Sequence, residues 1–136
     1  KLRMGRARLT DDLAALDSVR RSVGNDMAIM VDFNQGLSMA EALHRCHRLD
    51  DRGLTWIEEP VLYDTPDGYA QLAAVLATPI QIGENFYGPR EMHKALKRKA
   101  CDFVMLDYMR IGGVSGWMRA ACRRRGGAKR APGRSS

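Results

Sequence analysis

The sequence lacks the features that mark membrane, secreted and disulfide-rich proteins. No apolar run approaches the roughly 20 residues needed to cross a bilayer, and no secretory leader with a small-residue cleavage site is visible. There are only three cysteines, Cys46, Cys101 and Cys122, and no two of them have the spacing of a metal-binding pair. An odd number of scattered cysteines is typical of a reducing compartment, so we expect a cytoplasmic protein without disulfides.

The formal charge of +6 comes from the end of the chain. Residues 123–136 contain six Lys or Arg and no acid, which leaves 16 basic and 16 acidic residues in 1–122. This basic tail has no aromatic residue on which a base could stack and no known nucleic-acid-binding module. We therefore do not expect a nucleic-acid partner, while phosphate attraction to the tail keeps that alternative open.

Apolar, strand-like runs alternate with helical patterns along the chain. Thr10 is expected to cap the first helix, and Ser38 with Glu41 forms a capping-box pair at the second. The periodicity predicts strands at 27–34, 54–60, 79–85 and 101–109, and helices at 9–24, 38–53, 65–78, 88–100 and 112–122.

Apolar strands joined by helical crossovers predict an α/β fold with a parallel sheet covered on both faces. A doubly wound sheet and a (β/α) barrel both fit the pattern. The sequence has neither a Gly-x-Gly-x-x-Gly nor a Walker phosphate-binding loop. This absence disfavours a nucleotide-binding doubly wound sheet.

In each predicted strand the apolar run ends in an acid: Asp32, Glu58, Glu84 and Asp107, spaced by 26, 26 and 23 residues. In a parallel sheet these carboxylates leave the same end, and in a barrel that end carries the active site. Carboxylates that converge there repel one another, and a hard divalent cation removes the conflict. We therefore expect Asp32, Glu58 and Glu84 to bind Mg²⁺, with Glu59 facing the other way as a supporting partner.

Four motifs resemble the mandelate racemase branch of the enolase superfamily, the mandelate racemase/muconate lactonizing enzyme family. They are WIEEP, VDFNQGLSMAEA, IGENFYGPREMHKAL and VMLDYMRIGGVSGW. The resemblance covers roughly residues 1–121 and implies a (β/α)₇β barrel, of which this chain would hold about strands two to six. It also implies that Asp32, Glu58 and Glu84 hold Mg²⁺, and that an enediolate formed by loss of the proton α to a carboxylate is stabilised on the metal.

The same resemblance assigns Lys1 and Arg3 to the family's Lys-x-Lys pair, whose second lysine is the base. Arginine stays protonated and is a poor base, so Arg3 is expected to clamp a substrate carboxylate, to polarise an oxygen or to be a charged rim residue. A racemase needs bases on both faces of the substrate. An acid-sugar dehydratase therefore fits better, with a racemase or epimerase as the alternative.

Asp107 matches the family's sixth-strand aspartate, which orients a seventh-strand histidine that acts as general acid or base. No histidine occupies that place, because His44, His47 and His93 all lie within helical patterns. Asn34 is expected to contact the substrate or a metal-bound water, and Arg110 to contact the substrate or to pair with a neighbouring acid. The expected substrate is a small sugar acid or 2-hydroxy acid.

The resemblance stops at residue 121. We expect 1–121 to be a partial barrel domain, and 122–136, rich in Arg, Gly and Ala, to be a disordered or frameshifted tail. The family's capping domain and last strands have no counterpart here, so we expect this chain to be inactive alone and its intact relatives to be homo-oligomers. A non-catalytic remnant that only binds metal is the remaining alternative.

Overall fold

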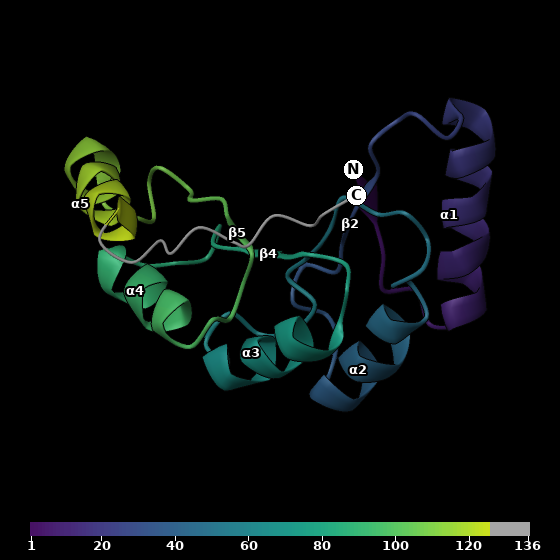
Figure 1. Ribbon diagram of the computed structural model, residues 1–136, viewed down its shortest axis with the longest axis horizontal. Helices are drawn as coiled ribbons and strands as arrows, with labels where there is room; N and C mark the ends of the chain where they lie inside the picture. The colour runs from purple at the N-terminus through teal and green to yellow at the C-terminus, as the bar shows by residue number, and fades with distance from the viewer. Residues whose placement is uncertain (126–136) are drawn as a thin grey trace, which may run out of the picture.

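The protein is described by a computed structural model, which places residues 1–125 in alternating strands and helices (Figure 1). The elements are β1 (Leu2–Arg3), α1 (Leu9–Val23), β2 (Met30–Asp32), α2 (Met39–His47), β3 (Trp56–Glu58), α3 (Pro66–Val75), β4 (Ile80–Ile82), α4 (Pro89–Lys97), β5 (Phe103–Val104) and α5 (Gly113–Arg125). Among these residues, no helix is both long enough and apolar enough to span a membrane.

The five strands form one parallel sheet in the order β1-β2-β3-β4-β5. Each strand therefore pairs with the next one in the chain, and the order never reverses. A doubly wound sheet requires such a reversal, whereas a (β/α) barrel does not. The arrangement confirms the α/β barrel-type fold expected from the sequence.

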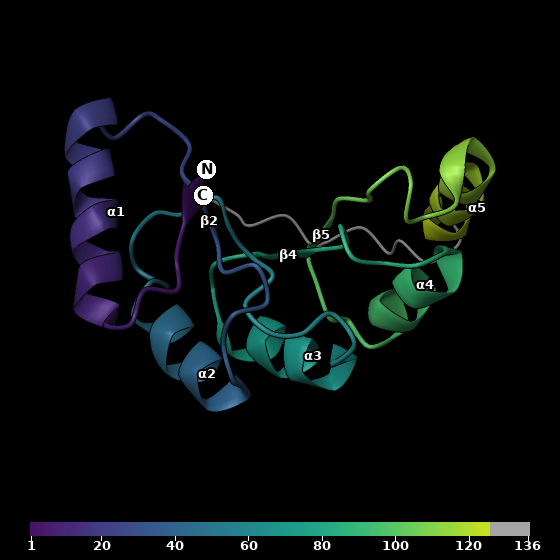
Figure 2. The same cartoon turned by 180° about the vertical axis from the view of Figure 1, so that it is seen from behind.

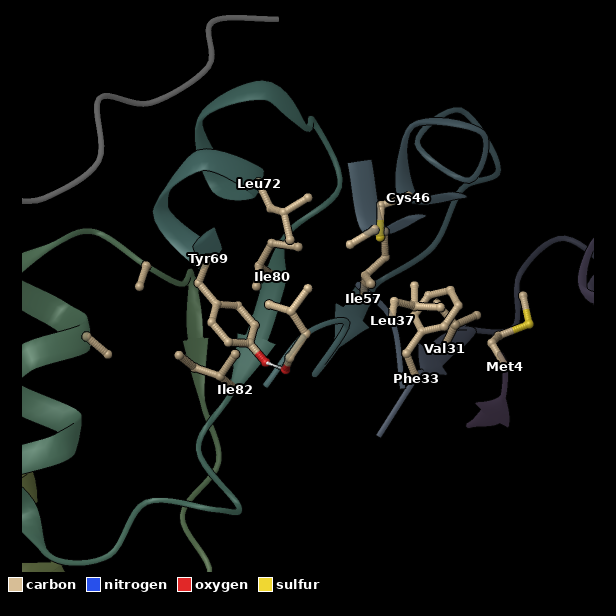
Figure 3. Packing of buried hydrophobic residues seen from close by; sticks show 14 of the residues in the cluster. Met4, Val31, Phe33, Leu37, Cys46, Ile57, Tyr69, Leu72, Ile80 and Ile82 are labelled. Atoms are coloured by element: carbon tan, nitrogen blue, oxygen red, sulfur yellow. Dashed lines mark hydrogen bonds between the residues drawn. The ribbon is translucent and has the colours of Figure 1, made fainter. Parts of the chain in front are cut away.

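The helices lie along one side of the curved sheet, as the two opposite views show (Figures 1 and 2). The expectation of a sheet covered on both faces is therefore wrong for these residues. The core lies between sheet and helices, where Val31, Ile57 and Ile80 of the strands pack with Cys46 of α2 and Leu72 of α3 (Figure 3). In a barrel the other face of the sheet points inward, which explains why helices cover only one.

Local sequence signals set several of the helix ends. Ser38 caps α2 through a complete capping box with Glu41, and Pro66 and Pro89 stand in the first turns of α3 and α4. Gly24 ends α1 with a φ of 78°. The expected cap at Thr10 is wrong: the N-cap of α1 is Arg8, whose carbonyl already accepts a hydrogen bond from the Asp11 backbone N–H at 3.1 Å.

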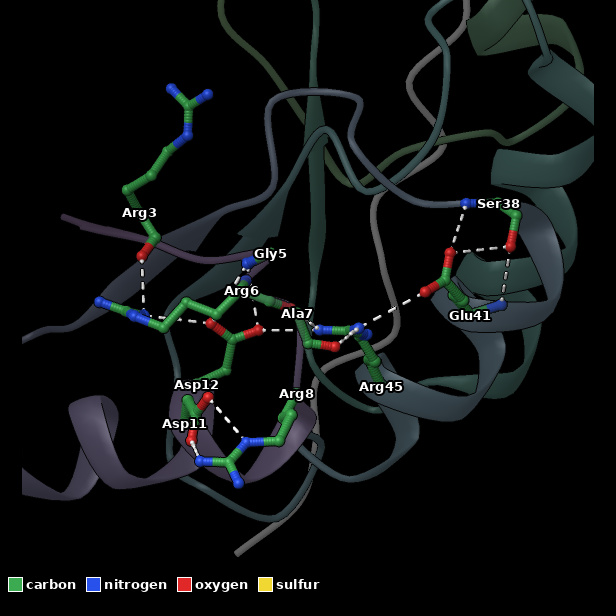
Figure 4. Close-up of polar contacts among 10 residues, drawn as sticks. All are labelled: Arg3, Gly5, Arg6, Ala7, Arg8, Asp11, Asp12, Ser38, Glu41 and Arg45. Atoms are coloured by element: carbon green, nitrogen blue, oxygen red, sulfur yellow. Dashed lines mark hydrogen bonds and ion pairs between the residues drawn. The ribbon is translucent and has the colours of Figure 1, made fainter.

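A buried ion pair ties the turn after β1 to helix α2 (Figure 4). The Asp12 carboxylate is fully buried and accepts hydrogen bonds from the backbone N–H groups of Gly5 and Arg6 and from the Arg6 and Arg45 guanidinium groups. Arg45 also donates to the carbonyls of Arg6 and Ala7. This cluster fixes the chain immediately after β1, and so the place of that strand and of Lys1, which precedes it.

The last strand is much shorter than the predicted 101–109. Strand β5 ends at Val104, and the chain then turns at 108–112, where the Ile111 N–H bonds to the Asp107 carbonyl. Helix α5 runs through the expected boundary at residue 121 to Arg125. The rest of the expected tail, 126–136, lies outside the described residues.

Candidate active site

Asp32 and Glu58 end neighbouring strands at the same edge of the sheet. They are the last residues of β2 and β3, and their Cα atoms are paired in the parallel register. Asp32 is 7% exposed and Glu58 only 1% exposed. The fold therefore brings two carboxylates side by side with little contact to water, as the spacing of the acids predicts.

The Lys1 ammonium lies between these two carboxylates. Its Nζ is 3.0 Å from Asp32 Oδ2 and 2.8 Å from Glu58 Oε1. Burial acts to lower the pKa of Lys1, but its hydrogen bonds to Glu58 and Asp32 outweigh burial and raise the pKa to about 12. The remaining oxygens accept hydrogen bonds from the Asn34 backbone N–H (Asp32 Oδ1, 2.8 Å) and from the Trp56 indole (Glu58 Oε2, 3.2 Å).

Glu84 follows β4 by two residues and lies at the same edge. Gly83 allows the chain before Glu84 to pass close to the Met105 backbone: its φ is 130°, and a Cβ there would lie 2.9 Å from the Met105 carbonyl oxygen. Glu84 Oε1 accepts hydrogen bonds from the side-chain amides of Asn34 and Asn85, each at 3.3 Å. Asn34 thus bridges the ends of β2 and β4.

The three predicted metal ligands do not form one compact group. Within residues 1–125, no three His, Cys, Asp or Glu side chains lie close enough together to hold a metal ion. Asp32 and Glu58 do converge on a cation, the Lys1 ammonium, and Glu84 is linked to Asp32 through Asn34. Oxygen donors arranged around a positive charge fit a hard divalent ion, and the assignment of these three residues as its ligands stays a prediction.

Glu59 directly follows β3 and leaves the extended conformation of the strand. Its φ is 39°, in the left-handed region, and its side chain is 1% exposed. Burial raises the pKa of the Glu59 carboxyl to about 7. One oxygen accepts a 2.7 Å hydrogen bond from the Asn85 amide, and the other is buried without a hydrogen-bond partner among the described residues.

The other predicted site residues occupy the rim of this edge. Arg3 is exposed, and its guanidinium has no hydrogen-bond or ion-pair partner within residues 1–125 (Figure 4). Asp107 is exposed and accepts a 2.8 Å hydrogen bond from the Arg110 backbone N–H. The expected pairing of Arg110 with an acid side chain is wrong: its guanidinium donates to the Glu84 carbonyl and to the Asn85 side-chain oxygen.

Sequence reasoning missed the contacts that Asn85, Trp56 and Lys1 make at this site. Asn85, which touches Glu59, Glu84 and Arg110, carried only one signal, its place directly after Glu84. Trp56 lies two residues before Glu58 and therefore on the same face of β3, a relation that alternation could have revealed. The ion pairs of Lys1 depend on the pairing of β1 with β2 and left no trace in the local sequence.

Comparison with known proteins identifies a family and several relatives that this chain resembles. A family model described as "Enolase C-terminal domain-like" matches residues 1–124. An L-talarate/galactarate dehydratase of Salmonella typhimurium is 38% identical over 120 residues, which is 88% of this chain and 30% of the relative. An N-succinyl-L-Arg/Lys racemase of Bacillus cereus is 35% identical over 115 residues, covering 84% of this chain and 31% of the relative.

A solved structure extends the likeness to three dimensions. The crystal structure of an enolase from the alpha-proteobacterium BAL199 with bound Mg superposes with a TM-score of 0.88 at 63% identity, covering 91% of this chain and 34% of that one. The chain thus spans about a third of the length of the proteins it matches. On its sequence and its fold, the chain belongs to the mandelate racemase/muconate lactonizing enzyme family of the enolase superfamily.

Proposed function

We propose that this chain supplies the Mg²⁺-binding part of an enzyme that removes the proton α to a carboxylate, most simply an acid-sugar dehydratase. Asp32, Glu58 and Glu84 would hold the ion. The observation that carries the proposal is the convergence of Asp32 and Glu58 on one positive charge, with Glu84 linked to them through Asn34. The BAL199 enolase, with bound Mg, supports the choice of metal.

Arg3 and Asn34, which lie near the three acids, would contact the substrate. When bound, Mg²⁺ supplies positive charge that makes an α-proton of a carboxylate more acidic. The Arg3 guanidinium is exposed and free of partners within residues 1–125, so it can bind a substrate carboxylate through two parallel hydrogen bonds. Asn34 lies between Asp32 and Glu84, where its amide can also contact a substrate hydroxyl.

Arg3 is the residue that favours dehydration over racemisation. An arginine keeps its proton, whereas a racemase needs a proton acceptor on each face of the substrate. The Salmonella relative, a dehydratase that acts on sugar diacids, supports this choice. The Bacillus cereus relative favours the second candidate, a racemase or epimerase acting on a different small carboxylate.

The same proposal includes the substrate class, the cellular compartment, the extent of the barrel part and the oligomeric state of intact relatives. The substrate is a small carboxylate, a sugar acid or a 2-hydroxy acid, and the protein works in the cytoplasm. Residues 1–121 form the barrel part, and intact relatives assemble as homo-oligomers. Asp107 would orient a catalytic partner, and Arg110 would bind substrate at the rim.

Metal binding is the first test, with Mn²⁺ as a probe because the same oxygen ligands suit both ions. Mn²⁺ affinity is measured by electron paramagnetic resonance (EPR) of the full chain. Replacing Glu58→Gln should weaken binding by at least about tenfold, since changes even one shell further out cost that much. Asp26→Asn is the matched control: it removes the same charge from an exposed side chain that precedes β2, at the opposite end of the sheet. Equal affinity of all three proteins would refute the proposed site.

Proton abstraction is the second test. The chain is incubated with galactarate and Mg²⁺ in D₂O, and exchange of the α-proton is followed by nuclear magnetic resonance. No exchange is expected from this chain alone, because the described residues provide no histidine at the site. Exchange that requires Mg²⁺ and disappears in the Glu58→Gln variant would support the catalytic assignment and overturn the expected inactivity.

A further inference from the structure

The Asn85 side chain connects three groups at the end of β4. Its Nδ2 donates to Glu59 Oε2 at 2.7 Å and to Glu84 Oε1 at 3.3 Å. Its Oδ1 accepts a hydrogen bond from Arg110 Nη1, which also donates to the Glu84 carbonyl at 3.2 Å. Both polar atoms of the amide are therefore in use, which fixes its orientation as well as its position.

Glu59 is the rigid end of this connection. Its backbone N–H donates to the Gln81 carbonyl at 3.1 Å, and its own carbonyl accepts from the Gln35 N–H at 2.7 Å. The chain around Glu59 is thus held from both neighbouring segments, and its side chain is almost fully buried. A carboxylate fixed in this way gives the Asn85 amide a stationary acceptor.

Glu84 is held through only one of its two oxygens. Asn34 and Asn85 both donate to Oε1, and among the side chains that the structure describes, up to residue 122, no hydrogen bond ends on Oε2. Glu84 is only half-buried and stands in a loop, so without these amides its side chain would have several rotamers open to it. The two amides leave Oε2 free in a defined direction.

We infer that Asn85 is a positioning residue, which uses buried Glu59 as an anchor and Arg110 as a brace to orient Glu84 toward a divalent cation. The inference rests on the proposed metal site and adds to it a residue that does not itself bind the metal ion. It explains why a nearly inaccessible acid, Glu59, follows the predicted ligand Glu58. Glu59 fixes the Asn85 amide, and that amide orients the next predicted ligand, Glu84. Residues of this kind control metal affinity through the direction of the ligand.

The test compares Mn²⁺ binding by the full chain with Asn85→Ala and with Asn25→Ala. Asn25 is a matched control, because its side chain is exposed in the loop before β2 and makes no hydrogen bond that the described residues show. Asn85→Ala should weaken Mn²⁺ binding about tenfold and alter the EPR line shape, because Glu84 is then free to reorient. Asn25→Ala should change neither.

A second variant keeps the test decisive if Asn85→Ala does not fold. Arg110→Lys conserves the charge at an exposed position but loses the guanidinium that braces Asn85. We expect a smaller loss of Mn²⁺ affinity with the same change in the spectrum. Unchanged affinity and an unchanged spectrum in whichever of these variants folds would overturn the role of Asn85.

Glu58→Gln separates failure of this inference from failure of the proposed function. If Glu58→Gln weakens Mn²⁺ binding and Asn85→Ala does not, the metal site stands and the positioning role falls. If neither variant changes binding, the proposed metal site itself is wrong, and the positioning role falls with it. Thermal unfolding of each variant, followed by circular dichroism, shows whether a loss of affinity accompanies a loss of structure.

Discussion

Replacing Arg45 by methionine should destabilise the protein by about 3 kcal/mol, because it removes a cation that compensates the buried Asp12 carboxylate. Breaking a buried ion pair by removing one partner typically costs about 3–5 kcal/mol. We expect the lower end, since the Arg6 guanidinium, 3.1 Å from Asp12 Oδ1, still pairs with Asp12. Methionine preserves the apolar stem of the side chain, so the loss comes from the ion pair with Asp12 and from the hydrogen bonds to the Arg6 and Ala7 carbonyls.

Urea unfolding followed by circular dichroism measures this cost. A slope of about 1–3 kcal/mol per molar urea converts 3 kcal/mol into a midpoint lower by at least about 1 M. The informative second variant is Asp12→Asn in the Arg45→Met background. It removes the uncompensated charge and keeps an oxygen that can accept from the Gly5 and Arg6 N–H groups.

The double variant should therefore be more stable than Arg45→Met alone. If the two variants unfold at the same urea concentration, a buried charge is not the source of the loss. A lower stability of the double variant would mean that Asp12 acts mainly through its backbone hydrogen bonds. Either result would refute the electrostatic reasoning for this cluster.

Two further changes test other parts of the fold. Burial acts to raise the pKa of Asp50, but hydrogen bonds from the Ala77 and Thr78 N–H groups outweigh burial and lower the pKa. The ionised Asp50 carboxylate therefore stabilises the folded chain. This stabilisation is present above the unfolded pKa of about 3.9 and is lost as pH falls through the lower folded value. Asp50→Ala should therefore lower the melting temperature at pH 7, and the gap to the unmodified chain should narrow in melts at progressively lower pH. Gly83→Ala should cost about 1–3 kcal/mol in urea unfolding, because its Cβ would lie 2.9 Å from the Met105 carbonyl oxygen. Gly53→Ala, with a φ of 62° and nothing within 4 Å, should cost only about 1 kcal/mol, and equal losses at the two glycines would contradict the steric argument.

The strand ends illustrate what the sequence could predict. Apolar runs ending in Asp32 and Glu58 located the carboxyl ends of β2 and β3, because alternation and strand length are local properties. Glu59 was harder to read: its φ of 39° takes the residue out of the extended conformation and its side chain is buried, while its place on the face opposite Glu58 stays a prediction. Backbone conformations of this kind depend on the surrounding loops and leave no period in the sequence.

The contacts that organise the site were beyond sequence reasoning for a different reason. Lys1 reaches Glu58 across 57 positions of the chain, and Asn34 reaches Glu84 across 50. Such contacts depend on sheet register, which is set by the strand order and by the packing of the helices. The resemblance to a known family supplied the barrel and the three acids, but the amides between them became visible only in the folded chain.

The Lys1 ammonium and the proposed metal ion would each offset the repulsion between neighbouring carboxylates. Carboxylates on adjacent parallel strands, about 4.8 Å apart, repel by about 3 kcal/mol at the effective dielectric constant of a partly buried site. Asp32 and Glu58 are in this register, and Glu58 is almost inaccessible to water, so solvent cannot screen the repulsion. The fold therefore requires a cation at this edge, and the Lys1 ammonium provides one. A divalent ion would add charge beside the third carboxylate, Glu84, whose only charge-stabilising contacts within residues 1–125 are two neutral amides.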